Sequence, residues 1–211
     1  MAGGESQVKR NRLILAVAAL AAAALAVPAG AQMMSAGWKF LEAVRKREGE
    51  DVEKSLGATG TATIINTQDY TTGDTALHIV TARRDRDWLN FLLYRGADPN
   101  KANNKGERPL GVAVGLDWID GAQLLIAKGA RVDDPGAQGE TALIAAVHQR
   151  DIEMVRLLLK SGASPTRADN SGRSAADYAA LLGSESPIAA EVAAATKTAA
   201  ARKQKTYGPS F

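Results

Sequence analysis

Glycine recurs along this chain at a constant interval, and this period constrains the fold more than any other feature of the sequence. Two sets of glycines share a period of 33 residues. The first set is Gly73, Gly106, Gly139 and Gly172. The second set is Gly96, Gly129 and Gly162, and an alanine follows each of them. A fixed period of about 20–50 residues indicates a repeat architecture. A unit this short cannot bury its own apolar faces, so neighbouring units must stack on one another. The sequence therefore predicts a solenoid.

Each unit is predicted to contain two helices. A short apolar helix follows the opening glycine, and a second helix carries leucines at helical spacing, as at Met154, Leu157 and Leu158. The high alanine content also favours helix. The glycine after each second helix suits the C′ position, where the backbone takes a positive φ. Three hydroxyl residues stand where a side-chain oxygen can cap the first helix of a unit: Thr75, Thr141 and Ser174.

The repeated segments resemble the ankyrin repeat, whose pattern is G-x-T-P-L-H-x-A, a second helix ending in L-L, and then G-A-D-x-N. Gly73-Asp74-Thr75-Ala76-Leu77-His78 and Gly139-Glu140-Thr141-Ala142-Leu143 carry the first element, and Gly96-Ala97-Asp98-Pro99-Asn100 carries the last. The resemblance extends over residues 70–186. It implies an all-α repeat solenoid of ankyrin-type helix-turn-helix units with β-finger loops. The family's glycine after the first helix is replaced here by Arg84, Asp117 and Arg150, so those loops must form without it.

The repeat register gives the expected domain boundaries. The expected segments are a signal peptide at 1–31, a diverged N-terminal capping repeat at 32–69, ankyrin repeats at 70–102, 103–135 and 136–168, a C-terminal capping repeat at 169–201, and a mobile basic tail at 202–211. In the N-terminal cap, Phe40–Val44 and Val52–Leu56 are expected to form helices, and Thr61–Ile65 a short strand. An alanine-rich helix is expected from Pro187 to about Ala201.

The first residues have the three parts of a secretory signal. Lys9, Arg10 and Arg12 precede an apolar stretch from Leu13 to Val27, and Ala29-Gly30-Ala31 then provides the A-x-A pattern for cleavage. The alternative is a retained membrane anchor, but a transmembrane helix needs about 20 apolar residues, and this stretch is shorter. Cleavage after Ala31 in a protein without cysteine favours the bacterial periplasm as its location.

The net charge of +3 comes from the two ends of the chain. Residues 32–195 carry 22 acidic and 19 basic side chains, whereas residues 196–211 contain Lys197, Arg202, Lys203 and Lys205 and no acidic residue. A nucleic-acid-binding protein should carry its positive charge on a folded face, so no nucleic-acid partner is expected. The basic tail leaves open an alternative function, that of an envelope-associated small-ligand or regulatory protein that touches anionic head groups.

The composition leaves little material for catalysis. The absence of cysteine excludes disulfides and thiolate chemistry, and the chain has two histidines. The resemblance makes His78 a structural histidine that bonds to loop backbone, whereas His148 is expected on an exposed surface. No nucleophile, base and oxyanion donor come together in the sequence, so we expect no enzymatic activity, no cofactor and no metal. An enzyme or a small-ligand protein remains the rival interpretation.

The resemblance implies that a protein partner binds the concave face, which finger tips and the exposed side of the first helices form. Trp118 falls in a loop and is a candidate anchor, while Trp88 is interpreted as a core residue of a second helix. Leu116 also argues against a plain solvated face. The chain itself is expected to be a monomer. Besides Trp118, alignment with the family gives these candidate partner-binding residues: Thr71, Thr72, Asp74, Arg83, Asn104, Lys105, Glu107, Leu116, Gln138, Glu140, His148, Gln149 and Arg173.

Overall fold

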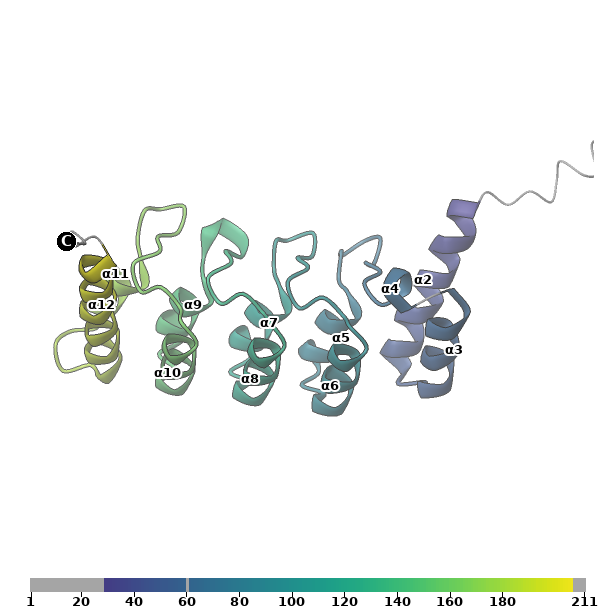
Figure 1. Ribbon diagram of the computed structural model, residues 1–211, viewed down its shortest axis with the longest axis horizontal. Helices are drawn as coiled ribbons and strands as arrows, with labels where there is room; N and C mark the ends of the chain where they lie inside the picture. Colours follow the sequence, from purple (N-terminus) through teal and green to yellow (C-terminus); the bar gives the residue numbers. More distant parts are fainter. Residues whose placement is uncertain (1–28, 60, 207–211) are drawn as a thin grey trace, which may run out of the picture.

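The repeated segments of the sequence fold as a row of antiparallel helix pairs (Figure 1). The computed structural model describes residues 29–59 and 61–206. The helices are α2 (Ala29–Lys46), α3 (Gly49–Thr59), α4 (Thr61–Ile64), α5 (Ala76–Ala82), α6 (Arg86–Tyr94), α7 (Pro109–Gly115), α8 (Ile119–Ala127), the 3-10 turn η1 (Ala137–Gly139), α9 (Ala142–Gln149), α10 (Ile152–Lys160), α11 (Ala175–Ala180) and α12 (Pro187–Thr206). The predicted all-α repeat solenoid is confirmed.

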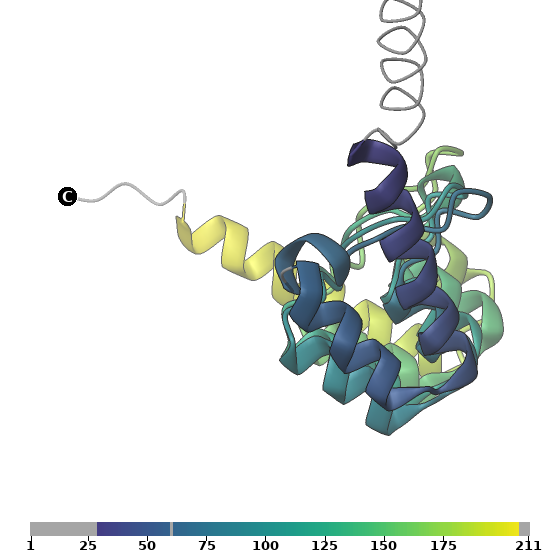
Figure 2. The same cartoon turned by 90° about the vertical axis from the view of Figure 1, so that its right-hand side faces the viewer.

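Two layers of helices run along the row. The first helices α2, α5, α7, α9 and α11 each pack on the next, and so do the second helices α6, α8, α10 and α12. Seen end on, the repeats superimpose, with the two layers side by side (Figure 2). The core lies between the layers and extends along the whole row.

The core is built from columns of leucines that keep the period of the glycines. Leu77, Leu110 and Leu143 form one column in the first helices, and Leu92, Leu125 and Leu158 form the other in the second helices; all six are buried. Burying one such side chain stabilises the fold by about 1.5–3 kcal/mol. Since the columns run through successive repeats that pack on one another, this burial depends on stacking.

The helix ends follow the predicted chemistry in most places. Thr141 and Ser174 accept hydrogen bonds from backbone N–H groups in the first turns of α9 and α11, which confirms both as caps. The glycines after the second helices have φ of 89°, 91° and 93°. The three loops that lack the family's glycine instead place Arg84, Asp117 and Arg150 in the left-handed region. An L-residue there is disfavoured by about 1–2 kcal/mol, which the adjoining helix packing must offset.

Two expectations about secondary structure were wrong. Thr61–Ile65 does not form a strand, because residues 61–64 form helix α4, and the buried side chains of Ile64 and Ile65 anchor this turn to the cap. A lone strand would leave its backbone groups unpaired, and a helix pairs its own. The alanine-rich helix also extends past its expected end near Ala201, since α12 continues to Thr206. The mobility of residues 202–211 stays a prediction. The remaining residues, 207–211, lie outside the described chain.

Trp118 lies in the core, contrary to the expectation that it anchors a partner. Its exposed fraction is 8%, and it occupies the N-cap position of α8. The six-membered part of the indole covers Gly121, where an added Cβ would overlap the ring. Gly121 therefore makes the space that Trp118 fills, which explains why the second helix of this repeat lacks a large apolar residue there.

We predict that Gly121→Ala destabilises the protein although alanine favours helix. The added methyl group must displace the Trp118 ring, and overpacking of this kind costs about 1–3 kcal/mol. Urea denaturation measured by circular dichroism gives the change in the free energy of unfolding.

Gly111→Ala in α7 is the matched control, because nothing lies within 4 Å of the Cβ that it would add. This substitution should stabilise the protein by about 0.5–1 kcal/mol. Equal effects of the two substitutions would contradict the assignment of Gly121 as a packing residue.

Candidate partner-binding surface

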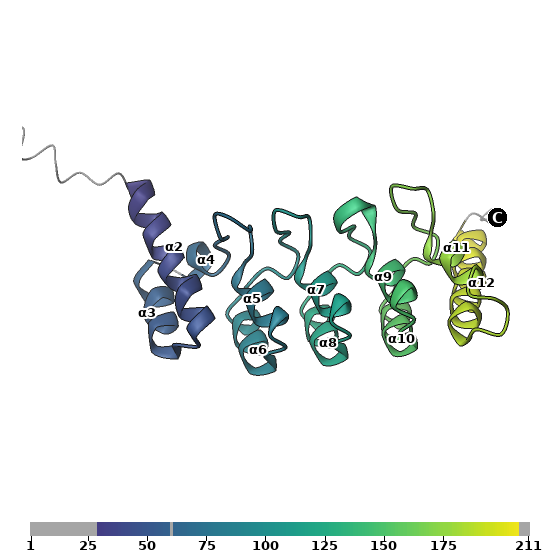
Figure 3. The ribbon, with the colours of Figure 1, turned by 180° about the vertical axis from the view of Figure 1, so that it is seen from behind.

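Four loops, here called fingers, project from the same side of the row (Figures 1 and 3). Fingers 1 to 4 comprise residues 69–74, 103–107, 136–140 and 169–173, and in each the first residue donates a backbone hydrogen bond to the carbonyl of the last, over 2.8–2.9 Å. The fingers are turns, and the only β-bridge among the described residues joins Ala168 to Ser174. The closed turns hold the finger tips in fixed positions above the first helices.

Carboxylates stabilise the first and last fingers from within. Asp69 accepts hydrogen bonds from the N–H groups of Thr71 and Thr72 at 2.8 and 3.1 Å, and these bonds together with Arg45 lower its pKa. Asp169 accepts from the Ser171 hydroxyl at 2.7 Å and from the Tyr178 hydroxyl at 2.8 Å, and these bonds hold its pKa well below the usual range. Both carboxylates are therefore charged at neutral pH and keep their turns closed.

Hydrogen bonds join finger 2 to finger 1 and finger 4 to finger 3. Asn104 donates from its backbone N–H to Thr72 O at 3.0 Å and from Nδ2 to Thr71 O at 3.1 Å, while Asn170 donates to Gln138 O at 3.0 Å. Gly73 permits this approach, since a Cβ there would overlap Asn104. These bonds use backbone carbonyls of Thr71, Thr72 and Gln138 and leave their side chains exposed. The predicted finger residues therefore lie on two bonded pairs of fingers that project from the same side of the row.

Tyr70 is a surface residue that the sequence analysis missed. Finger 1 has one residue more than the others, since Asp69–Asp74 spans six positions and Asn103–Glu107 spans five. Tyr70 follows Asp69 directly and is 89% exposed. An exposed aromatic ring on a rigid turn is typical of a contact that contributes strongly to binding. The signal for this insertion was that Asp69 and Asn103 lie one position farther apart than successive glycines do.

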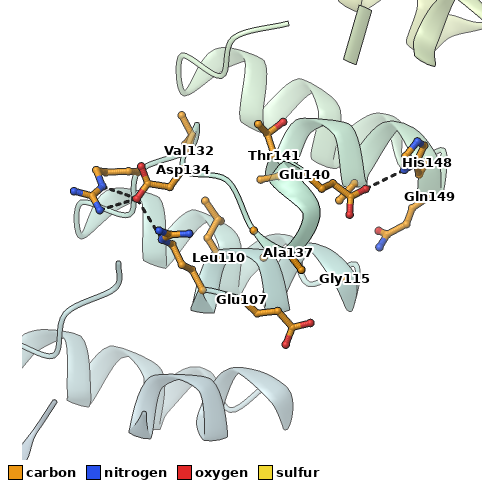
Figure 4. A pocket seen from close by; sticks show the side chains of 16 residues that line it. Glu107, Leu110, Gly115, Val132, Asp134, Ala137, Glu140, Thr141, His148 and Gln149 are labelled. Atoms are coloured by element: carbon orange, nitrogen blue, oxygen red, sulfur yellow. Dashed lines mark hydrogen bonds and ion pairs between the residues drawn. The ribbon is translucent and has the colours of Figure 1, made fainter. Parts of the chain in front are cut away.

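A hollow of about 290 Å³ lies between the second and third repeats, with α7 and α9 along its base (Figure 4). We call it the α7–α9 hollow. Small residues make up much of its base, because α7 contributes Gly111 and Gly115 beside the buried Leu110, and α9 contributes Ala142 and Ala145. The predicted residues Glu107, Glu140, His148 and Gln149 line its rim.

Two groups of paired charges stand on opposite sides of this hollow in Figure 4. On one side Asp134 binds Arg108 at 3.2 Å and Arg131 at 2.6 Å. On the other side His148 Nδ1 lies 2.9 Å from Glu140 Oε1. The hollow therefore offers a partner a small-residue base between polar groups of both signs.

The contacts of His148 link the third repeat to the fourth. Its ring meets the Tyr178 ring edge to face, with centroids 4.4 Å apart, and the Tyr178 hydroxyl donates to Asp169. The guanidinium of Arg173 also lies over the Tyr178 ring, 5.9 Å from its centroid. Glu140, His148 and Arg173 thus belong to one polar patch on the exposed side of the last two repeats.

Three predicted partner-binding residues do not offer free side chains. Trp118 is buried against Gly121, as described above. Arg83 is bound internally, since it donates to Val44 O at 2.7 Å and to Asp85 Oδ2 at 3.1 Å, and so connects the end of α5 to α2. Leu116 is half-buried and packs against the core at the end of α7. These positions lie at the loops between paired helices, where the family alignment could not distinguish outward side chains from bridging ones.

The histidines behave as predicted. His78 is buried; Nδ1 accepts from Thr75 N–H at 3.1 Å, and Nε2 lies 3.0 Å from Glu107 O in the next repeat. Burial lowers the pKa of His78, and the neutral ring with hydrogen on Nε2 satisfies both contacts. His148 is exposed. Within the described residues, no group of three or more histidine, cysteine, aspartate or glutamate residues is placed to hold a metal ion.

We predict that protonation of His78 destabilises the fold on mild acidification. The unfolded chain takes up a proton near pH 6.5, whereas the folded chain resists it because the pKa of His78 is lowered. The free energy of unfolding should therefore fall as the pH drops from about 7.5 to about 5.5, an interval that brackets the histidine pKa. Urea denaturation at both pH values measures the fall.

His148→Gln is the control for this experiment, because the chain has two histidines and this one is exposed. His148→Gln should keep the fall in stability, and His78→Gln should lose most of it. A fall of unchanged size in His78→Gln would show that another group causes it.

No helix within residues 29–59 and 61–206 is long and apolar enough to cross a bilayer. The expected signal peptide, apart from the residues that follow position 28, lies outside the described residues.

Comparison with known families gives two matches. The family described as "Ankyrin repeats (3 copies)" matches residues 119–190, and the one described as "Ankyrin repeat" matches residues 72–104. Together these matches include both helices of the first and third repeats, α8 of the second repeat and α11 of the fourth.

Individual relatives match part of this chain. Transient receptor potential cation channel subfamily A member 1 of Homo sapiens is 35% identical over 118 residues, which are 56% of this chain and 10% of the relative. Neurogenic locus notch homolog protein 1 is 35% identical over 119 residues in Danio rerio and 32% identical over 145 residues in Xenopus tropicalis. These matches span 56% and 67% of this chain but only 5% and 6% of the relatives. The chain thus corresponds to a small part of each of these proteins.

Proposed function

The chain is an ankyrin-repeat protein, and from this premise we propose that it is a non-enzymatic module that binds a protein partner through its fingers and first helices. The proposed surface comprises the finger residues Tyr70, Thr71, Thr72, Asn104 and Lys105 and the rim of the α7–α9 hollow. Its mechanism is contact over several repeats at once, with a few anchors that provide most of the affinity. The fixed fingers keep the entropy cost of binding low, because little ordering remains to be done.

The two glycines of α7 at the base of the α7–α9 hollow are the observation that carries this proposal. Glycine inside a helix costs about 0.5–1 kcal/mol relative to alanine. Neither Gly111 nor Gly115 has an atom within 4 Å of the Cβ that alanine would add, so packing within the fold does not require glycine at either position. A partner side chain that approaches the α7 backbone closely would require it. We therefore assign the hollow to an apolar anchor of the partner.

The charges around the hollow favour selection among partners. Glu107 and Glu140 are acidic and Lys105 and Arg173 are basic, so both signs occur along the fingers. Mixed charge at the rim of an interface contributes more to specificity and association rate than to affinity. A partner with the complementary pattern would dock in a single register.

The proposed location is the bacterial periplasm, after cleavage of the signal peptide behind Ala31. The supporting observations are the positive, apolar and A-x-A segments of the sequence. Cleavage is also compatible with the fold, because the buried residues of α2, such as Phe40, Leu41 and Val44, all follow Gln32. Mass spectrometry of the protein from a periplasmic fraction should give a chain that begins at Gln32. An intact chain in the membrane fraction would instead support a retained anchor.

We predict that Gly111→Phe abolishes capture of the partner in a pull-down from periplasmic extract, because the ring fills the α7–α9 hollow. Tyr70→Ala should weaken capture by removing the finger anchor, and alanine substitution at an anchor typically costs about 2 kcal/mol or more. Quantitative mass spectrometry of the captured protein measures both effects.

Tyr94→Ala is the matched control for Tyr70→Ala. Tyr94 is 79% exposed but ends a second helix, far from the fingers. Circular dichroism should show that all three variants remain folded. Equal capture by Gly111→Phe and the unchanged protein would place the binding site elsewhere.

A further inference from the structure

The second-helix layer has one open junction. Along this layer α6 packs on α8, α8 on α10 and α10 on α12, whereas α3 and α6 lack a contact of that extent. The gap is a groove of about 620 Å³ lined by Gly49, Glu50, Glu53, Asp87, Trp88 and Phe91. We call it the α3–α6 groove. Its lining residues belong to α3 and α6, and these helices lie away from the fingers (Figure 1), so the groove is separate from the finger surface.

Two aromatic rings form the apolar wall of this groove. Trp88 and Phe91 meet edge to face at 73°, with centroids 5.8 Å apart, and both are half-exposed. The register shows that Trp88 is unusual, because Met154 occupies the same place in α10 and is fully buried. The interpretation of Trp88 as a core residue was therefore only half right, since one side of the ring packs on the core and the groove exposes the rest.

The charged residues that line the α3–α6 groove are all acidic. Glu53 is paired with Arg95, but Glu50 and Asp87 make no ion pair within the described part of the chain. Two basic groups stand over the rings and are already engaged. Arg83 lies 5.7 Å from the Trp88 centroid and is held by Asp85, and Arg95 lies 5.1 Å from the Phe91 centroid. Glu50 and Asp87 thus form a negatively charged site without an ion-pair partner, and the two rings form an apolar wall beside it.

We propose that the α3–α6 groove binds a basic segment of a partner protein, with a lysine or arginine side chain lying across Trp88. The aliphatic stem of such a side chain covers apolar surface while its charged end stays in water. A cation near an indole face gains a further attraction from the ring. The carboxylates of Glu50 and Asp87 pair with the positive charge of this side chain. This second site is on the opposite layer from the finger surface, so a single partner or two partners can occupy both sites.

Other possible partners of the α3–α6 groove would interact less favourably with its acidic side chains. A purely apolar partner would leave Glu50 and Asp87 without compensation at the edge of an interface, and an acidic partner would be repelled. The complementary charge therefore selects a basic segment.

The test uses the full mature chain and fluorescein-labelled hexa-arginine amide as the probe, with binding measured by fluorescence anisotropy. Trp88→Met takes the side chain that α10 carries at the same register and so should keep the fold. We expect Trp88→Met to weaken binding about fivefold, the size of a cation–π contact at a partly exposed site. The double variant Glu50→Gln, Asp87→Asn should weaken it at least as much.

The control removes the same charge from the other layer. Glu107→Gln, Glu140→Gln lowers the negative charge by two on the finger side, and we expect its affinity for the probe to match that of the unchanged protein within about twofold, the usual effect of distant charges screened by salt. An equal loss in this control, unchanged binding by Trp88→Met, or no binding by the unchanged protein would each overturn the proposal. Gly111→Phe should bind the probe normally, so failure of the finger surface and failure of this groove give different results.

Discussion

Contact between neighbouring repeats is the interaction on which the whole structure depends. A helix pair of this size exposes apolar residues on both of its broad sides, and only the next pair can cover them. The buried leucine columns show that each repeat depends on its neighbours, because the columns continue from each repeat into the one that packs on it. Hydrogen bonds reinforce the stack at its edges. His78 reaches Glu107 O and Asn104 reaches Thr71 O, so the fingers are ordered by the same neighbours that bury the core.

This dependence also fixes which parts of the molecule are free to act. The inner side of each helix is committed to stacking, and the backbone of each finger is committed to its own closure and to the adjacent finger. What remains are finger side chains and the outer sides of the two helix layers. The α7–α9 hollow and the α3–α6 groove both arise between repeats, where one repeat presents less bulk than its neighbour could cover. A solenoid acquires binding sites where the stacking is incomplete.

The period of the glycines was sufficient to predict the fold class and the helix pairs, and the hydroxyl residues at the helix starts predicted the caps Thr141 and Ser174. The structural role of His78 followed from the resemblance to the ankyrin repeat. All of these features depend on local chemistry within a repeat. The N-terminal cap was harder to predict, since the β-branched residues of Thr61–Ile65 favour a strand but the segment packs as helix α4. Helix α12 likewise continued beyond its expected end, because alanine-rich sequence propagates helix without a clear stop signal.

Exposure was the property that the sequence predicted least well, and the tryptophans show why. Trp118 looked like a free anchor in a loop, yet Gly121 on the next turn gives it a place in the core. Trp88 looked like a core residue, yet α3 stands too far from α6 to cover it. Each outcome is decided by a residue or helix outside the local motif, so a single repeat cannot reveal it.

The helices contain two kinds of glycine, which differ in whether neighbouring atoms occupy the space of the missing side chain. Gly121 is required by the fold, because the Trp118 ring occupies the space of its missing side chain. Gly111 and Gly115 are not required by anything that the described chain places near them, yet they weaken a helix of only seven residues. A destabilising residue with no structural compensation is most simply explained by a requirement that arises outside the chain. For α7 this requirement is close approach by a partner, and the polar groups of Arg108, Asp134, Glu140 and His148 stand around the place where that partner would enter.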